Sequence, residues 1–173
     1  PTILYLFEGT KLVAKITKQI PDLIHLTEVL FGEFIRYGFT DAAGYGDHNG
    51  LGQGVVDGLR AKGIKITGVY NQSGAQDSDR FLNLGAELWF GLKDLITSCA
   101  LPIPTDDPDL YTQLISRKYI TRANGKIQLE SKKEHKKRTG GVSPDSADAF
   151  VLCFAGITPA KLMEDRKSTR LNS

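Results

Sequence analysis

The sequence predicts a single mixed α/β domain, with a sheet flanked by helices and an added β-hairpin before the last helix. Residues 3–7 are rich in β-forming side chains, and residues 12–17 alternate after a short turn, which is typical of a hairpin. Strand and helix patterns then alternate through residues 21–115, which favours a mixed sheet with helices on its faces. Asn124-Gly125, between two β-rich runs, indicates a second hairpin.

The first elements follow from local patterning. Residues 3–7 and 12–17 form the strands of the opening hairpin, with a turn at 8–10. Pro21-Asp22 then begins a helix, because the apolar residues after it recur at spacings of three and four. These residues are Leu23, Leu26, Leu30 and Phe34.

Later elements are defined by turn residues and periodicity. Pro144 at the first position of the last helix fits a residue that lacks a backbone N–H. The expected elements are a short strand at 39–41, a glycine-rich loop at 44–54, a short helix ending at Gly63, a strand at 64–70, a long helix at 78–99, a helical turn or two at 107–115, hairpin strands at 118–121 and 126–129, and a last helix at 143–154.

Length and charge limit the function classes. The 173 residues suffice for one domain with a sizeable core, and no apolar run could span a bilayer, so no membrane partner is expected. The net charge of +2 is unevenly distributed: residues 117–138 hold nine Lys/Arg and two Glu, whereas residues 41–109 hold ten acids and five Lys/Arg. This pattern is compatible with a site for cations and a polyanion, although on charge alone a solvated loop is the simpler interpretation.

Three acids are candidates for the chemistry. Asp41 ends the expected strand at 39–41, and strand ends are where α/β folds place active sites. Asp145 and Asp148 are three residues apart on the last helix, so their carboxylates face the same way. Asp145 also fits a structural acid favoured by the helix dipole. Asp148 lies among apolar residues, where a carboxylate needs a partner or a cation.

Phosphodiester hydrolysis would explain such a set of acids. Carboxylates from distant segments can hold two Mg²⁺ or Mn²⁺ ions, typically about 3.5–4 Å apart. One ion activates the attacking water, and the other stabilises the leaving oxygen. Hard cations of this kind prefer carboxylate oxygens to thiolates.

Several short segments follow one another in an order that is more telling than any one of them. They are Asp41–Gly44 with Gly52–Leu59, Phe81–Asn83 with Ala86–Trp89, Leu101-Pro102, Gly125–Lys132 with Lys136–Arg138, and Ser143–Ala149. In that order they resemble the second catalytic segment, the central helix, the approach to the hairpin, the basic hairpin with its exit, and the third catalytic segment of one family. That family is the nuclease domain of the tailed-bacteriophage terminase large subunit.

The resemblance implies an RNase H-like fold and a metal-dependent endonuclease that cleaves concatemeric double-stranded viral DNA during genome packaging. Two Mg²⁺ or Mn²⁺ ions are the implied cofactors. Asp41 is then the second metal-binding acid and Asp145 the third, with Asp148 as a neighbouring ligand or a supporting acid. The sequence does not choose between Asp145 and Asp148 as the principal ligand.

The basic residues after the hairpin are predicted to bind DNA. They are Lys132, Lys133, Lys136, Lys137 and Arg138. Such residues would contact the DNA backbone beside the metals without reading sequence. The resemblance also implies a portal protein and a small terminase subunit as partners, in the cytoplasm of the infected bacterial host. No GxxxxGK[ST] loop occurs, so no ATP site is expected in this fragment.

The sequence also leads to an expectation about each end of the chain. In the family, the first acid lies on a strand before the opening hairpin, and residues 3–7 resemble that hairpin's first strand. The first catalytic strand is therefore expected to be missing, which would leave the fragment weak or inactive. Residues 165–173 resemble a translated sequencing adapter, so the domain is expected to span 1–164 of an N-terminally truncated metagenomic fragment.

Some residues receive a structural interpretation. Residues 45–51 resemble an insertion into a loop that is usually shorter in the family. Asp47 and His48 there invite a metal or acid–base role, but a polar turn is the preferred interpretation. Trp89 is predicted to be a core residue. Glu87 fits either a residue supporting the site or an ion-paired surface acid.

Two other functions are compatible with the sequence. A junction resolvase or other RNase H-like nuclease would share the acids, but not the basic exit leading into Ser143-Pro144-Asp145. A non-catalytic module that docks DNA or the portal would keep the fold without the chemistry. An Asp on a strand upstream of Pro1 would favour the enzyme.

Overall fold

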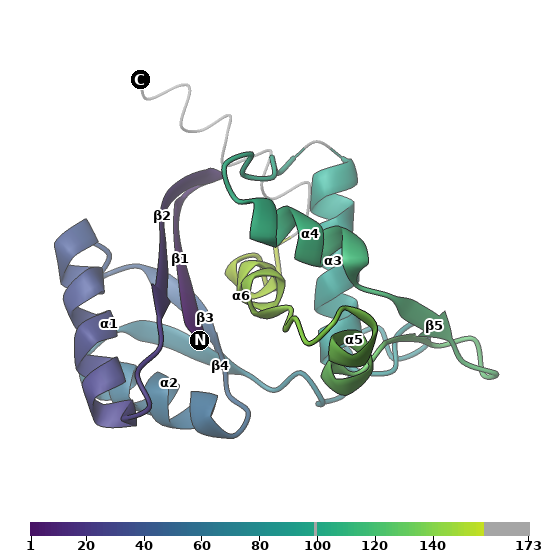
Figure 1. Ribbon diagram of the computed structural model, residues 1–173, viewed down its shortest axis with the longest axis horizontal. Coiled ribbons are helices and arrows are strands. Elements are labelled where there is room, and N and C mark those ends of the chain that lie inside the picture. Colours follow the sequence, from purple (N-terminus) through teal and green to yellow (C-terminus); the bar gives the residue numbers. More distant parts are fainter. Residues whose placement is uncertain (99, 158–173) are drawn as a thin grey trace.

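Over residues 1–98 and 100–157, which a computed structural model describes, helices surround short two-stranded sheets (Figure 1). The elements are β1 (Thr2–Glu8), β2 (Lys11–Lys18), α1 (Leu23–Tyr37), β3 (Ala43–Asp47), α2 (Leu51–Ala61), β4 (Lys65–Val69), α3 (Leu84–Thr97), α4 (Pro108–Ser116), β5 (Tyr119–Thr121), β6 (Ile127–Leu129), α5 (Lys132–Arg138) and α6 (Asp145–Cys153). The predicted mixed α/β class and the added hairpin before the last helix are confirmed. The expected tail at 165–173 lies outside the described residues.

The β1–β2 hairpin separates two hydrophobic cores. The strands pair antiparallel from Thr2 opposite Lys18 to Glu8 opposite Lys11. Because side chains alternate along a strand, Leu6 faces a cluster formed with α1 and α2, while Tyr5 faces one formed with α3, α4 and α6. Figure 1 shows the hairpin standing between α1 and α6. The hairpin therefore fixes the position of α6 relative to the first half of the chain.

Strand β3 lies where a glycine-rich loop was expected, and the short strand expected at 39–41 is absent. β3 pairs in parallel with β4. Packing explains the glycine: a Cβ on Gly46 would meet Val56 Cγ2 of α2 at 2.6 Å. The strand thus approaches α2 more closely than a side chain would permit, so tertiary packing outweighs the low strand propensity of glycine.

The sequence predicted a helix from residue 78, but helix α3 begins at Leu84. Asn83 caps it, with its side chain accepting from the Ala86 N–H. Residues before the cap form a loop that Glu87 holds, because its carboxylate accepts from the N–H groups of Gln76 and Asp77. Glu87 therefore has a structural role in this loop.

A buried carboxylate joins the hairpin to α4. Asp107 caps α4 by accepting from the Leu110 N–H. It also accepts from the Tyr5 hydroxyl at 2.7 Å and pairs with the Lys15 ammonium at 2.8 Å. Burial alone would raise the pKa of Asp107, but these donors lower it overall. Both strands are thereby attached to the same helix end.

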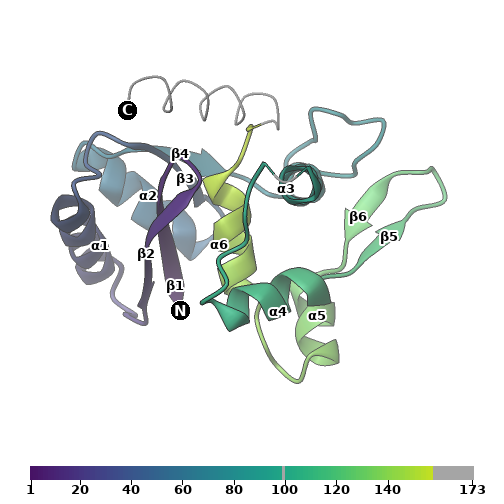
Figure 2. The same cartoon turned by 90° about the horizontal axis from the view of Figure 1, so that it is seen from above.

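A second network attaches α5 to the β5–β6 hairpin, which Figure 2 shows projecting from the body of the protein. Glu130 follows β6, and its carboxylate accepts from the Arg138 guanidinium, from the Lys118 N–H at 2.8 Å and from His135 Nδ1 at 3.0 Å. Burial would raise the pKa of Glu130, but these donors lower it to about 2. A capping box between Ser131 and Glu134 begins the helix.

Replacing Gly46 tests the close approach of β3 to α2. We expect Gly46→Ala to lower the free energy of unfolding by about 1–3 kcal/mol, because the added methyl group overpacks the contact with Val56. Gly44→Ala, in the same strand with open space around it, is the matched control. Urea denaturation should show no loss for the control; equal losses in both variants would contradict the packing argument.

Replacing Glu130 tests the network through its pH dependence. A carboxylate with a folded-state pKa below its unfolded value of 4.5 stabilises the fold above that pH and loses the effect as pH falls toward 2. Glu130→Gln should therefore cost about 2 kcal/mol at pH 7. Its deficit should shrink progressively between about pH 5 and pH 2.

Urea denaturation across that pH range measures the difference. Glu8→Gln serves as the control, since Glu8 is exposed and makes no ion pair within residues 1–98 and 100–157. It should stay within about 0.5 kcal/mol of the parent protein. A Glu130→Gln deficit that does not change with pH would show that the loss is one of packing.

Candidate functional site

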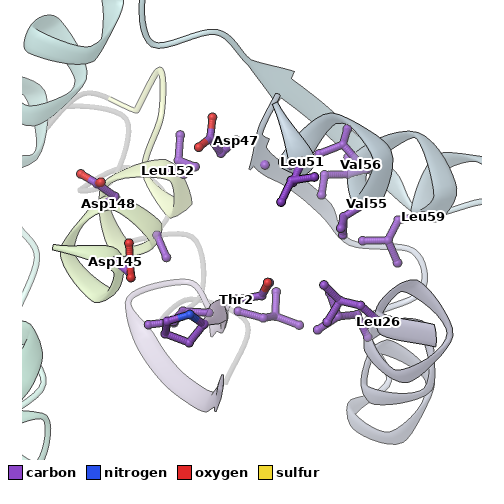
Figure 3. Close-up of a pocket in the computed structure, with 18 of the residues that line it drawn as sticks. Thr2, Leu26, Asp47, Leu51, Val55, Val56, Leu59, Asp145, Asp148 and Leu152 are labelled. Atoms are coloured by element: carbon purple, nitrogen blue, oxygen red, sulfur yellow. The ribbon is translucent and has the colours of Figure 1, made fainter. Parts of the chain in front are cut away.

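A cavity of about 350 Å³ lies between β1 and β3, walled by α1, α2 and α6 (Figure 3). Most of its lining is apolar, from residues such as Leu26, Val56 and Leu59. The polar lining includes carboxylates and one lysine: Asp47, Asp145, Asp148 and Lys132. Figure 3 shows Asp145 and Asp148 projecting from α6, with Asp47 near Leu152 of the same helix.

Asp47 is placed in the cavity by the carboxyl end of β3. Its Oδ1 accepts hydrogen bonds from the backbone N–H of Asn49 at 3.2 Å and from the Asn49 side chain. Directly behind it, a Cβ on Gly52 would clash with the Asp47 carbonyl oxygen, so α2 begins in contact with this strand end. The residue that sequence patterning assigned to a polar turn therefore lines the site. The signal in the sequence was the pair of glycines Gly46 and Gly52 on either side of Asp47, which permit close backbone packing there.

Asp41 lies elsewhere. It is exposed in the turn before β3 and is not part of the cavity lining. Strand β3 runs for five residues, about 13 Å from Ala43 to Asp47, and Asp41 lies before its first residue, so the two carboxylates stand near opposite ends of the strand. Asp47, Asp145 and Asp148 thus line the same cavity, whereas the predicted Asp41 does not.

Asp145 and Asp148 both occupy the first turn of α6. The Ser143 hydroxyl donates to Asp145 Oδ1 at 2.7 Å, and the helix end has no side-chain cap, with Pro144 at the cap position. The positive end of the helix dipole favours negative charge in this turn. The other face of α6 is held in the core by Ala147 and Phe150, which are fully buried. The two carboxylates are therefore presented to the cavity by a fixed helix.

Lys132, the first residue of α5, faces these acids. Its ammonium lies 2.8 Å from Asp148 Oδ2 and 3.9 Å from Asp145 Oδ1. Burial opposes the charged form of Lys132, but Asp148, then Asp145 and Asp47, attract the charge, and the net effect raises its pKa. The two α6 carboxylates thus share one ammonium, and Asp47 adds to the negative charge around it.

The five predicted DNA-binding residues divide into three groups. Lys132 pairs with the acids of α6, and Arg138 is held by Glu130 and the Ser116 carbonyl. Lys133, Lys136 and Lys137 are exposed and make no ion pair within the described part of the chain. These three side chains, called the α5 lysines below, are available to a polyanion.

The donors around the cavity fit a hard cation, because carboxylate oxygens are the preferred ligands of Mg²⁺ and Mn²⁺. Asp148 Oδ2 is shielded from solvent and accepts no hydrogen bond of ordinary geometry from the described residues, although it faces the Lys132 ammonium. Within residues 1–98 and 100–157, however, no three His, Cys, Asp or Glu side chains are already grouped to hold a metal ion. His48, which follows Asp47, turns away and pairs with Asp57 at 3.1 Å.

No described helix is long and apolar enough to cross a bilayer. No family model matches the chain, and no curated protein matches it either.

Several solved structures do match. One is a lysine-to-alanine mutant of the nuclease domain of the large terminase subunit gp2 of bacterial virus Sf6, with manganese and beta-thujaplicinol. It has a TM-score of 0.67 and 20% identity, and the match covers 84% of this chain and 77% of that one.

Two further structures of the same Sf6 domain match similarly. The nuclease domain itself has a TM-score of 0.65 and 20% identity, with 88% of this chain and 82% of that chain covered. A mutant form with calcium has a TM-score of 0.65 and 20% identity, with 86% and 79% covered. The predicted RNase H-like fold is therefore confirmed: the chain has the fold of the nuclease domain of a phage large terminase subunit.

Proposed function

We propose that this chain is the metal-dependent endonuclease domain of a terminase large subunit, which cleaves concatemeric double-stranded viral DNA during genome packaging. The observation that supports this most directly is that Asp47, Asp145, Asp148 and Lys132 line one cavity. The fold it shares with a phage terminase nuclease domain adds independent support. By the same proposal, the protein acts in the cytoplasm of the infected bacterial host.

Asp47, Asp145 and Asp148 are the residues that would hold Mg²⁺ or Mn²⁺ in this proposal. Two such ions would supply a water of lowered pKa and stabilise charge on the leaving oxygen. The chain's own contribution is to fix the carboxylates: β3 holds one, and the first turn of α6 holds the other two. Lys132 offsets part of the charge of the two α6 carboxylates.

The cavity suggests how the site is completed. Within the described residues, β1 pairs only with β2 and β3 only with β4, so each has an unpaired edge. Both strands line the cavity, and unpaired strand edges are templates for another strand. We propose that a further strand lies between them and contributes another acid next to Asp145. In the native protein this would be the strand predicted to precede Pro1.

The α5 lysines would contact the DNA backbone. They lie on the same short helix as Lys132, so phosphates bound there would be close to the carboxylates. Contacts of this kind supply affinity without sequence preference. The portal protein and the small terminase subunit are the further partners that this function would require.

The proposal is tested with plasmid nicking by a version extended before Pro1 by a strand carrying an Asp. We expect Mn²⁺-dependent conversion of supercoiled to nicked plasmid, lowered about 100-fold or more by Asp145→Asn or Asp47→Asn, since each would lose a metal ligand. Asp41→Asn is the matched control and should stay within about twofold, well below the loss of a ligand.

Each alternative has its own outcome in this assay. Loss of nicking with Asp41→Asn but not Asp47→Asn would support the ligand assignment made from sequence and overturn the one made from the cavity. Absence of nicking in the extended protein, with DNA binding retained, would favour a docking module. Resolution of branched DNA in preference to linear duplex would favour a junction resolvase.

DNA binding by the α5 lysines is tested by titrating a duplex oligonucleotide, monitored by fluorescence anisotropy at several salt concentrations without divalent metal. The triple variant Lys133→Glu, Lys136→Glu, Lys137→Glu should bind more weakly. Its slope of log affinity against log salt should fall by about 2–3, because each lost phosphate contact removes about 0.9.

The control has the same change in net charge at exposed lysines elsewhere, with Lys11, Lys65 and Lys93 each replaced by Glu. This control variant should retain most of the slope of log affinity against log salt concentration. If both triple variants changed the slope equally, binding would depend on net charge and not on α5.

A further inference from the structure

Trp89 contacts one of the candidate metal ligands. Its indole Nε1–H donates to Asp148 Oδ1 at 3.3 Å, so that α3 reaches across to α6. The two oxygens of Asp148 therefore have different partners: Oδ1 accepts from the indole, while Oδ2 faces Lys132 and the cavity. An indole N–H can only donate, so Oδ1 is the acceptor in this contact and the indole fixes its direction.

A cation in turn lies over the indole. The Arg117 guanidinium carbon lies 5.6 Å from the centre of the Trp89 ring, a cation–π distance. Two of its nitrogens, Nε and Nη1, are buried and have no hydrogen-bond partner among the described residues. Burial lowers the pKa of Arg117, while the negative charges of Asp148 and Glu130 oppose that shift. Arg117 is therefore held by the ring and by the field of Asp148.

We propose that Trp89, with Arg117 stacked on it, is a positioning residue that orients Asp148 and keeps Oδ2 turned toward the metal. This inference rests on the proposed function. Partners behind a ligand fix its rotamer, and their loss typically weakens metal binding about 10–100-fold. Because Trp89 is the only tryptophan in the chain, its indole also reports on the occupancy of the site.

The contact is tested first without metal. A single tryptophan gives one indole cross-peak in a ¹H–¹⁵N spectrum of the full chain. Asp148→Asn should move that peak, because it replaces a charged acceptor by a neutral one. Glu87→Gln, on the same helix but bonded to the loop before it, should leave it in place. An unmoved peak in Asp148→Asn would overturn the proposal even if Trp89 variants failed to fold.

The second test measures Mn²⁺ affinity from the electron paramagnetic resonance signal of free Mn²⁺. Trp89→Phe keeps a ring and removes only the donor, and it should weaken binding about 10-fold. Mn²⁺ should also broaden the indole cross-peak of the parent protein, whereas diamagnetic Ca²⁺ should not. Phe90→Leu, in the neighbouring core cluster, should lower stability without changing Mn²⁺ affinity.

The outcomes separate this inference from the function on which it rests. If the parent protein bound no Mn²⁺, and the extended version bound none either, the proposed function would fail. If Asp148→Asn weakened Mn²⁺ binding but Trp89→Phe did not, the function would stand and the positioning role would be excluded. In the extended enzyme, Trp89→Phe should raise the Mn²⁺ concentration for half-maximal nicking and leave the rate at saturating Mn²⁺ nearly unchanged.

Discussion

The attraction between the Lys132 ammonium and the carboxylates that line one cavity is the interaction on which the arrangement of this protein depends. Asp47, Asp145 and Asp148 come from two separate elements, and the Lys132 ammonium lies between the acids of α6. To present that lysine, α5 must be held from its other side, which is what the network of Glu130 with Arg138 does. The β5–β6 hairpin is therefore part of the support of the site, although it lies outside the cavity.

Packing in the hydrophobic cores fixes the helix that carries Asp145 and Asp148. The β1–β2 hairpin is packed on both faces, so α6 lies against one core while α1 and α2 lie against the other. Phe150 and Ala147 exclude solvent completely on the inner side of α6, and a helix packed in this way cannot rotate without opening the core. The directions of Asp145 and Asp148 thus follow from apolar packing, and their polar contacts adjust only the side chains.

Sequence patterning predicted the mixed α/β class, both hairpins and the helix carrying Asp145 and Asp148, because periodicity and turn residues are local signals. It missed β3, since Gly44 and Gly46 have low strand propensity and the close contact with Val56 is visible only in three dimensions. The position of Asp47 at the cavity was therefore not predicted either. The sequence also did not predict which basic residues pair with acids and which stay exposed. The direction of each lysine depends on helix α5, which was not predicted.

The charges in the cavity explain why a nuclease built this way would need metal ions. DNA phosphates bound by the α5 lysines would lie within about 8 Å of helix rise of Lys132, and hence near the acids it faces. Lys132 offsets only one of three negative charges, so the cavity would still repel a phosphate. Two divalent cations on the same carboxylates would reverse the sign of the local charge and turn a repulsive surface into an attractive one. The orientation of Asp148 then affects substrate approach as well as metal binding. Trp89 and Arg117, which orient Asp148, would therefore influence both.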